Sequence, residues 1–177
     1  MTKDNFVVIT GGPGSGKSTI LNALSKLGYK VIDETARIII KERLSKGLSP
    51  RPNPEEFAQQ IFDIDFKNYI SNIDTSQLLF FDRSFLDSAA MIFEANKIET
   101  IRVTEILNTY RFSKNAFIAP PWKEIYHNDS ERDQSYDDSV QIYEKLYNWY
   151  DLNNYALIQI PKCDIDSRIH FILDNIN

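Results

Sequence analysis

Five short stretches of the chain are apolar and rich in β-branched and aromatic residues, at residues 6–10, 30–33, 78–82, 116–119 and 155–160. Each of them is followed by sequence with the character of a helix. Strands of a parallel sheet read as continuous apolar runs because helices cover both faces of the sheet. The alternation of such runs with helical segments therefore predicts an α/β fold.

The helix boundaries can be placed from capping residues. In the first helix Ile20, Leu21, Leu24 and Leu27 share one face, and Gly28 stands where a glycine commonly ends a helix. Asn53, Pro54 and Glu56 predict the start of a helix that runs to about Tyr69, and Ser84 and Asp87 predict the start of the next one. A later helix is indicated by the apolar stripe of Val140, Tyr143, Leu146, Tyr147 and Tyr150, and a last helix is expected over 166–176.

Length and composition indicate one folded unit. The chain has 177 residues, of which 42% are hydrophobic and 12% aromatic, as in ordinary globular proteins. It contains no evident repeat, linker or low-complexity tract, so we expect a single domain over residues 1–177. The longest loops, 46–53 and 120–139, are of the kind that carries function, and we place a lid segment at about residues 121–139.

Charge and cysteine content narrow the possible partners. A formal net charge of -5 argues against broad attraction to nucleic acid or to anionic membranes, so an anion site has to be local. The only cysteine, Cys163, cannot form a disulfide within the chain, which favours a reducing compartment. No stretch approaches the ~18 apolar residues of a membrane span, and the start of the chain does not read as a signal peptide. We expect a cytoplasmic protein with no nucleic-acid partner and no membrane insertion.

The most specific signal follows the first apolar stretch. The segment GGPGSGKST contains the full pattern G-x-x-x-x-G-K-[ST] between a predicted strand and a predicted helix, which is the context that a phosphate-binding loop requires. Glycines let backbone N–H groups point at phosphate oxygens, and the helix start adds the positive end of its dipole. We expect Lys17 to reach the terminal phosphates of ATP and Ser18 to ligate Mg²⁺. The predicted nucleotide-binding residues are Gly11, Gly12, Pro13, Gly14, Ser15, Gly16, Lys17, Ser18 and Thr19.

Switch GTPases and motor ATPases do not fit the rest of the chain. Gly47 is the last glycine, so the D-x-x-G element of switch GTPases cannot follow the third strand. The segment PKCD at residues 161–164 resembles the guanine-reading N-K-x-D only weakly. Arg83 stands where motor ATPases usually carry a second carboxylate, and there is no room for their helical lid domain. The choice between ATP and GTP stays open at this point.

Charged residues follow the second and third predicted strands, and in open parallel sheets ligands bind beyond the carboxyl ends of the strands. Phosphoryl transfer needs a carboxylate to orient or deprotonate the attacking hydroxyl, an acid near Mg²⁺ and cations around the moving charge. Solvated strand ends and surface ion pairs are the alternative interpretation. We assign catalysis to Lys17, Glu34, Asp82 and Arg83, acceptor binding to Asp33, Glu34, Arg37, Arg83 and Asp87, and the metal to Ser18 and Asp82.

The polar segment after the fourth predicted strand contains Asp129 and Arg132, one helical turn apart. A lid that closes over a transferred phosphate excludes water and can deliver an arginine to the developing charge. We expect Arg132 to act in this way in catalysis, and a solvated loop whose charges pair with one another is the alternative. His127 and His170 have no Cys or second His at metal-ligand spacing, so we expect ordinary surface or partly packed residues. The tyrosines and tryptophans from Trp122 to Tyr155 are expected to be core and stripe residues, and a base-stacking platform is the alternative.

The segments GGPGSGKST, DETAR, FFDRS and NDSER, in this order, make the chain resemble the predicted P-loop ATPases of the AAA_28 group. That group is related to the ribosylnicotinamide kinase domain of NadR proteins and, more distantly, to thymidylate and deoxynucleoside kinases. The resemblance covers nearly the full length. It implies a five-stranded sheet in the order 2-3-1-4-5, an acceptor pocket beneath the second and third strand ends, and a lid arginine.

The chain departs from the deoxynucleoside kinases at one position after the second strand, where those enzymes have a Glu-Pro pair and this chain has Glu34 and Thr35. Their acceptor specificity is therefore not transferred. We interpret the chain as an ATP- and Mg²⁺-dependent phosphotransferase that acts on a small hydroxylated acceptor such as a nucleoside or nucleotide. The alternative is a regulatory module that binds ATP or GTP with little turnover. A true acceptor pocket would favour the enzyme, with four side chains converging on the γ-phosphate: Glu34, Arg37, Asp82 and Arg83.

Overall fold

The computed structural model describes residues 1–95, 100–126 and 134–176, and the statements below concern these residues. Its sheet has five parallel strands in the order β2-β3-β1-β4-β5, as the family resemblance implied. Each strand lies within about one or two residues of the apolar stretch that predicted it. The strands are β1 (Phe6–Gly11), β2 (Lys30–Ile32), β3 (Leu79–Asp82), β4 (Asn115–Ala119) and β5 (Ala156–Gln159).

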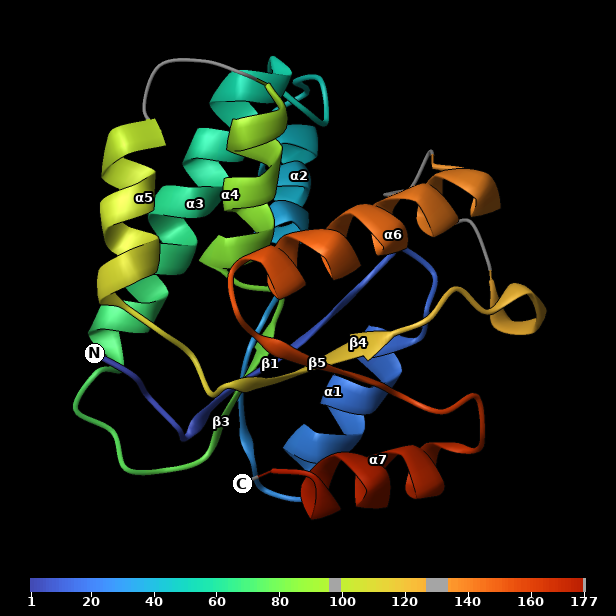
Figure 1. Cartoon of the computed structure of the whole chain (residues 1–177). Helices are drawn as coiled ribbons and strands as arrows, with labels where there is room; N and C mark the ends of the chain where they lie inside the picture. The colour runs from blue at the N-terminus through green and yellow to red at the C-terminus, as the bar shows by residue number, and fades with distance from the viewer. Residues whose placement is uncertain (96–99, 127–133, 177) are drawn as a thin grey trace.

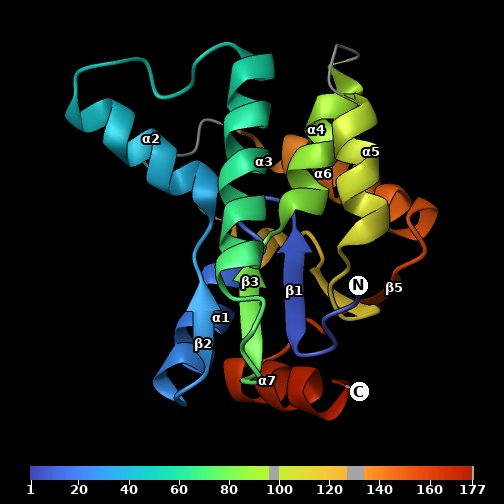
Figure 2. The same cartoon turned by 90° about the vertical axis from the view of Figure 1, so that its left-hand side faces the viewer.

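Helices cover both faces of the sheet, so the molecule has three layers (Figures 1 and 2). One face is covered by α1 (Lys17–Lys26) and α7 (Ile165–Asp174). The other face is covered by α3 (Pro54–Ser71), α4 (Phe85–Glu94), α5 (Thr100–Thr109) and α6 (Tyr136–Leu152). The helix α2 (Thr35–Ser45) packs against α3, and a single 3-10 turn, η1 (Lys123–Ile125), follows β4.

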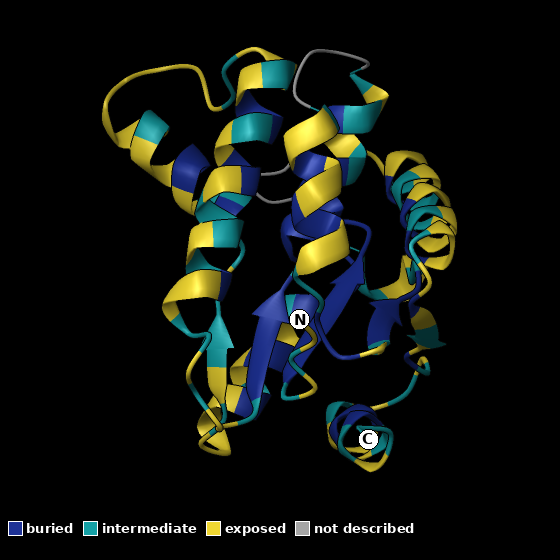
Figure 3. Ribbon diagram, turned by 60° about the vertical axis from the view of Figure 1, so that its left-hand side comes forward, coloured by how far each residue is buried: buried dark blue, intermediate teal, exposed yellow. Residues whose placement is uncertain are grey.

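The central strands divide the core into two clusters. Alternate side chains of β1 point to opposite faces, so Phe6 and Val8 pack under α3 to α6, whereas Val7 and Ile9 pack against α1 and α7. All residues of β1 and β3 are buried, while the edge strands β2 and β5 keep exposed residues (Figure 3). The continuous apolar runs in the sequence therefore reflect burial on both faces.

Several predicted helix ends have the expected capping geometry. Gly28 has φ 92, and the N–H of Tyr29 donates to the carbonyl of Leu24, as in a Schellman C-cap. The Asn53 side chain accepts from two backbone N–H groups at the start of α3. Ser84 and Asp87 form a reciprocal capping box at the start of α4. These local predictions succeeded because capping depends on residues that are neighbours in sequence.

Two predicted apolar stripes were partly wrong. Leu27 is 62% exposed, because it is the C-cap residue of α1 and lies beyond the last buried turn. Tyr147 is 43% exposed, while Leu146 and Tyr150 of the same helix are buried as predicted. Among the described residues, no helix combines the length and the apolar character needed to cross a bilayer.

Candidate active site

The phosphate loop joins the end of β1 to the start of α1 and brings the predicted nucleotide-binding residues together. The loop curls around Lys17, whose ammonium group donates to the carbonyl oxygens of Gly11 at 3.0 Å and Gly12 at 2.8 Å. Ser15 closes the curl by donating to the Gly12 carbonyl at 2.8 Å. Burial, with a further contribution from the charge of Arg83, lowers the pKa of Lys17 to about 8. An anion bound beside Lys17 would offset this loss of charge.

Two glycines of the loop are enclosed by residues on either side of the segment 127–133. A Cβ atom on Gly12 would lie 2.4 Å from the carbonyl oxygen of Ser139. Gly14 has φ 72, and a Cβ atom there would lie 2.4 Å from the ring of Tyr126. The Ser139 hydroxyl also donates to the carbonyl of Pro13 at 2.6 Å. The start of α6 and the end of η1 therefore pack directly on the phosphate loop, where a larger side chain would not fit.

A cavity of about 580 Å³ opens beside the loop and the first turn of α1. Its far wall contains Trp122 and Arg168, with the Arg168 guanidinium over the indole ring at 5.5 Å from the ring centroid. Arg168 is only 3% exposed and donates to the Ser15 carbonyl at 3.2 Å, while its Nε has no hydrogen-bond partner among the described residues. Trp122 thus lines a cavity and does not belong to the core, unlike Tyr150.

Arg168 was not among the predicted site residues, although the sequence contains a signal for it. It lies on the stripe formed by Ile165, Ile169 and Ile172, where a charged residue interrupts an apolar helix face. An arginine in such a position needs a buried partner, and here it finds the phosphate loop. The half-buried thiol of Cys163 lines the same cavity.

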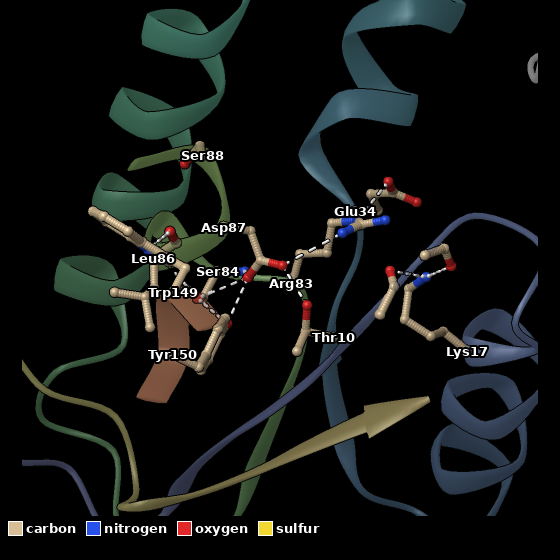
Figure 4. Close-up of polar contacts among 12 residues, drawn as sticks. Thr10, Lys17, Glu34, Arg83, Ser84, Leu86, Asp87, Ser88, Trp149 and Tyr150 are labelled. Carbon is tan, nitrogen blue, oxygen red and sulfur yellow. Dashed lines mark hydrogen bonds and ion pairs between the residues drawn. The ribbon is translucent and has the colours of Figure 1, made fainter. Parts of the chain in front are cut away.

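The residues that follow β2 and β3 place Glu34 between Arg37 and Arg83, and Figure 4 shows the Arg83 side of this arrangement. One carboxylate oxygen of Glu34 lies 3.1 Å from Nε of Arg83, and the other lies 3.1 Å from Nε of Arg37. Burial alone would raise the pKa of Glu34, but the charges of Arg83, Lys17 and Arg37 together hold this pKa below its ordinary value. Glu34 is therefore an ionised carboxylate in a fixed orientation. Asp33, by contrast, is exposed and lines neither of the two cavities described in this section.

Arg83 lies in an unusual backbone conformation, with φ 68, directly after β3. A positive φ is uncommon for a residue with a side chain and is tolerated where surrounding contacts impose it. The contacts are visible in Figure 4, where the Arg83 side chain lies between Glu34 and Asp87. Burial opposes its charge, but the carboxylates of Glu34 and Asp87 raise the pKa of Arg83 above its already high ordinary value. The guanidinium is thus permanently charged and aimed along the strand ends.

Asp87 lines the second cavity, but its carboxylate is already engaged by protein groups. One oxygen accepts from the Thr10 hydroxyl and from Arg83, at 3.4 Å for the arginine. The other accepts from the backbone N–H of Ser84 at 3.0 Å and from the Tyr150 hydroxyl at 2.6 Å. Asp87 therefore holds Arg83 in place and connects the start of α4 to α6 and β1. Neither Thr10 nor Tyr150 had been predicted from sequence as part of the site.

Asp82 ends β3 and is 8% exposed, with one carboxylate oxygen, Oδ1, that has no hydrogen-bond partner among the described residues. Burial, and then the negative charge of Glu34, raise the pKa of Asp82 to about 7. An unpartnered carboxylate oxygen together with the Ser18 hydroxyl offers the hard oxygen ligands that Mg²⁺ prefers. Residues 1–95, 100–126 and 134–176 contain no group of three or more His, Cys, Asp or Glu residues suited to a metal. Mg²⁺ needs no such group when phosphates and water supply most of its ligands.

A second cavity, of about 410 Å³, is lined by residues of α2, α3, α4 and α6 and of the loops beside them. Its volume falls within the range of about 300–1,000 Å³ typical of small-molecule sites. The predicted residues Lys17, Glu34, Arg37, Arg83 and Asp87 line it. Lys17 and Arg37 also line the first cavity, so the two cavities meet at these side chains.

The predicted lid residues Asp129 and Arg132, and also His127, lie outside the described residues. Gln134 and Ile142, which follow that segment, line the second cavity. His170 is exposed, and its ring nitrogen Nδ1 lies 2.8 Å from the carbonyl oxygen of Asp166.

The model of the family AAA_28, described as an AAA domain, matches residues 6–168 of the chain. No curated protein gives a significant match. Three similar solved structures are deoxyadenosine kinase from M. mycoides in different ligand states. The one with the products dCMP and a flexible dCDP bound has a TM-score of 0.69 and 16% identity, and the alignment covers 97% of this chain and 98% of that chain.

The structure of the same kinase with bound dATP gives a TM-score of 0.66 at 16% identity, covering 97% of this chain and 99% of that chain. The structure of that kinase with bound dCTP gives a TM-score of 0.57 at 15% identity, and the alignment covers 97% of this chain and 98% of that chain. At identities this low, the TM-scores establish that the two proteins share a fold over nearly the whole of both chains.

Proposed function

The chain belongs to the AAA_28 family, and from this premise we propose that it is an ATP- and Mg²⁺-dependent kinase whose acceptor is a small hydroxylated molecule, a nucleoside or nucleotide. The observation that carries the proposal is the meeting of two cavities at Lys17 and Arg37. One cavity follows the phosphate loop and the other is walled by Glu34 and Arg83. A kinase needs this arrangement, because donor and acceptor must meet in line at the transferred phosphate.

The phosphate loop is suited to the donor. Backbone N–H groups of the loop and the start of α1 would bind the phosphates, and Lys17 would exchange its two carbonyl contacts for phosphate oxygens. The base of the donor would enter the cavity walled by Trp122 and Arg168, where an aromatic ring and a guanidinium offer stacking surface.

Glu34 is suited to orient the hydroxyl of the acceptor. A carboxylate held by two arginines accepts a hydrogen bond well but is a weak base, because its pKa is depressed. In a loose phosphoryl-transfer transition state little proton transfer is needed before the new bond forms. Glu34 would therefore position the attacking oxygen and accept its proton late in the reaction, while Arg83 and Arg37 stabilise charge on the moving phosphoryl group.

Ser18 and Asp82 are the residues that would hold Mg²⁺. When bound, Mg²⁺ supplies charge neutralisation for the β- and γ-phosphate oxygens. Its positive charge would also lower the pKa of Asp82 and keep that carboxylate ionised. We also propose that the protein is cytoplasmic.

The role of Arg132 as a lid arginine remains a prediction. A guanidinium delivered to the transferring phosphate can raise kcat by about 10³ or more in well-placed cases. Arg132→Ala is therefore expected to lower single-turnover rates strongly while leaving ATP affinity within about tenfold of wild type. Equal rates with a good acceptor would show that this arginine belongs to a solvated loop.

The proposed function is tested by measuring ADP release with a panel of nucleosides and nucleoside monophosphates. We expect at least one acceptor to raise ADP release well above the rate without acceptor, and we expect Lys17→Ala to remove that increase. Tight ATP binding with no stimulation by any acceptor would favour the regulatory module instead. That module requires the first cavity but gives no reason for the second, with Glu34 and Arg83 in its wall.

A further inference from the structure

Asp65, in the middle of α3, is an acidic residue for which the proposed chemistry has no use. It follows Phe57 and Ile61 at intervals of four residues, so the three side chains form one stripe along the helix, and all three line the second cavity. The stripe is apolar apart from Asp65. An isolated carboxyl group in such a position carries a desolvation cost, which calls for a structural or a functional explanation.

Two hydroxyl groups reach Asp65 from neighbouring helices. Thr35, at the start of α2, donates to one carboxyl oxygen, and Ser88, on α4, approaches the other at 3.5 Å. The second contact is at the limit of hydrogen bonding. A carboxylate has about four lone-pair sites, so two hydroxyl groups leave it with spare acceptor capacity.

Asp65 lies close to the proposed reaction centre, because the two residues that contact it adjoin residues of that centre in the sequence. Thr35 directly follows Glu34, and Ser88 directly follows Asp87, which holds Arg83. An acceptor whose hydroxyl group meets Glu34 would therefore place the rest of its structure against Asp65. The walls around it are largely apolar and include Ile40, Phe57, Ile61 and Met91, as suits a flat ring.

Resting on the proposed kinase function, we propose that Asp65 selects the acceptor by accepting a hydrogen bond from an amino group on its ring. The acceptor class is then an amino-bearing nucleoside rather than one that presents a carbonyl oxygen at the same place. A carbonyl oxygen would face the lone pairs of a carboxylate with no proton between them. A buried polar group that loses its partner discriminates strongly between otherwise similar ligands.

The ionisation of Asp65 gives the selection a pH dependence. Burial, and also the negative charges of Asp87 and Glu34, raise the pKa of Asp65 to about 7, against the hydrogen bonds from Thr35 and Ser88. Above this value Asp65 only accepts hydrogen bonds, whereas below it the acid can also donate to a carbonyl oxygen. The other charged side chains that line this cavity are Lys17 from the phosphate loop, Glu34 and Arg37 from the start of α2, Arg51 from the loop before α3, Arg83 and Asp87 from the start of α4, and the ion pair of Glu94, at the end of α4, with Lys145 on α6.

The test compares kcat/KM for deoxyadenosine with that for deoxyinosine, and for deoxycytidine with that for deoxyuridine. Within each pair an amino group is replaced by a carbonyl oxygen. We expect the wild-type protein to favour the amino member by about tenfold to a hundredfold at pH 8, as for a hydrogen bond to a charged group. Asp65→Asn should reduce the ratio at least about tenfold, because its amide can donate to a carbonyl oxygen. The matched control is Asp63→Asn, two residues away on α3, which is exposed and paired with Arg102, and it should leave the ratio unchanged.

If Asp65 only linked α2, α3 and α4 through its contacts with Thr35 and Ser88, Asp65→Asn would change the turnover of all four nucleosides by a similar factor. Such a result would overturn the assignment. The wild-type ratio at pH 6 and pH 8 provides a second test that needs no variant. Titration of Lys17 or Asp82 changes kcat/KM for every acceptor alike and cancels from the ratio. Protonation of Asp65, by contrast, should lower the ratio of the amino to the carbonyl member at pH 6. A ratio that is the same at both pH values would also overturn the assignment. If none of the four nucleosides is phosphorylated while another acceptor of the panel raises ADP release, the role of Asp65 fails and the proposed kinase function stands. If no acceptor of the panel raises ADP release, the kinase function itself fails.

Discussion

Lys17 is a buried ammonium group whose contacts are two backbone carbonyl oxygens, those of Gly11 and Gly12. A phosphate is a stronger partner, so we expect Lys17→Ala to weaken Mg·ATP binding by about 1.5–3 kcal/mol, or roughly tenfold to a hundredfold. Titration calorimetry measures the change. Lys26→Ala, at the exposed end of the same helix, is the control. Equal ATP affinity for Lys17→Ala and wild type would remove the basis for the donor site.

Glu34 makes a different contribution, because it contacts two arginines rather than the phosphate loop. Glu34→Gln keeps the shape of the side chain but removes its charge, and we expect kcat to fall by about 10²–10⁴ while ATP affinity changes little. Pre-steady-state rates with a confirmed acceptor measure this loss. Glu42→Gln, exposed on α2, should be without effect. If Glu34→Gln turns over at the wild-type rate, the orienting role passes to another carboxylate such as Asp82.

At this scale the sequence was informative where the signal is local. The pattern of the phosphate loop and the charged residues after β2 and β3 could be read directly from the sequence. The structure brings Glu34, Arg37 and Arg83 into contact, while their roles in acceptor binding and catalysis stay predictions. The positive φ of Arg83 could not be predicted, because it depends on carboxylates that are distant along the chain. The same holds for Asp65, whose partners lie 30 and 23 residues away in sequence.

At the scale of secondary-structure elements, the junction between α4 and α6 supports the site. Tyr150 is fully buried in α6, and its hydroxyl donates to Asp87, which caps α4 and contacts Arg83. Tyr150→Phe leaves the ring in place but takes a hydrogen bond from a buried carboxylate. We expect a loss of about 1.5–3 kcal/mol in the free energy of unfolding, measured by urea denaturation.

The control for this prediction lies on the same helix. Tyr143 donates to the Gln159 side chain at an exposed position, so Tyr143→Phe should change the free energy of unfolding by less than about 0.5 kcal/mol. A similar small effect for Tyr150→Phe would show that the contact between α6 and α4 adds little to stability.

The elements themselves were predicted unevenly. The five strands could be located because burial on both faces produces continuous apolar runs. The helices α2 and α5 were not located individually. In α2 the run Ile38, Ile39 and Ile40 is β-branched and suggests a strand, and the helix is stabilised by packing against α3 rather than by propensity.

At the scale of the whole molecule, the site is assembled from segments spread over the chain, from Thr10 on β1 to Arg168 on α7. The parallel sheet brings the ends of its strands to one edge, which is why strand-end residues could be assigned to a common site. The sheet order alone does not determine which helix faces close over that edge. Asp65, Tyr150 and Arg168 entered the site through helix packing, which a single sequence does not specify.

The stability of the whole molecule should depend on pH through Asp65. Its pKa is raised in the fold from an ordinary value of 3.8 to about 7, so between these values the folded state holds a proton that the unfolded state releases. The free energy of unfolding therefore decreases as the pH rises through this window. Asp65→Asn removes the titration, and relative to wild type its free energy of unfolding should increase by about 1–3 kcal/mol from about pH 4.5 to about pH 8.

Urea denaturation at the two pH values measures this difference, and taking Asp65→Asn relative to wild type cancels the titration of every other group. Asp63→Asn provides the reference, because its exposed carboxyl should give a nearly constant difference from wild type. The expected signature is a gain for Asp65→Asn that is small at the lower pH and larger at the higher one. A difference that stays constant with pH would mean that Asp65 ionises as readily in the fold as in the unfolded chain, and the cavity would then have to be more hydrated around Asp65 than its apolar walls suggest.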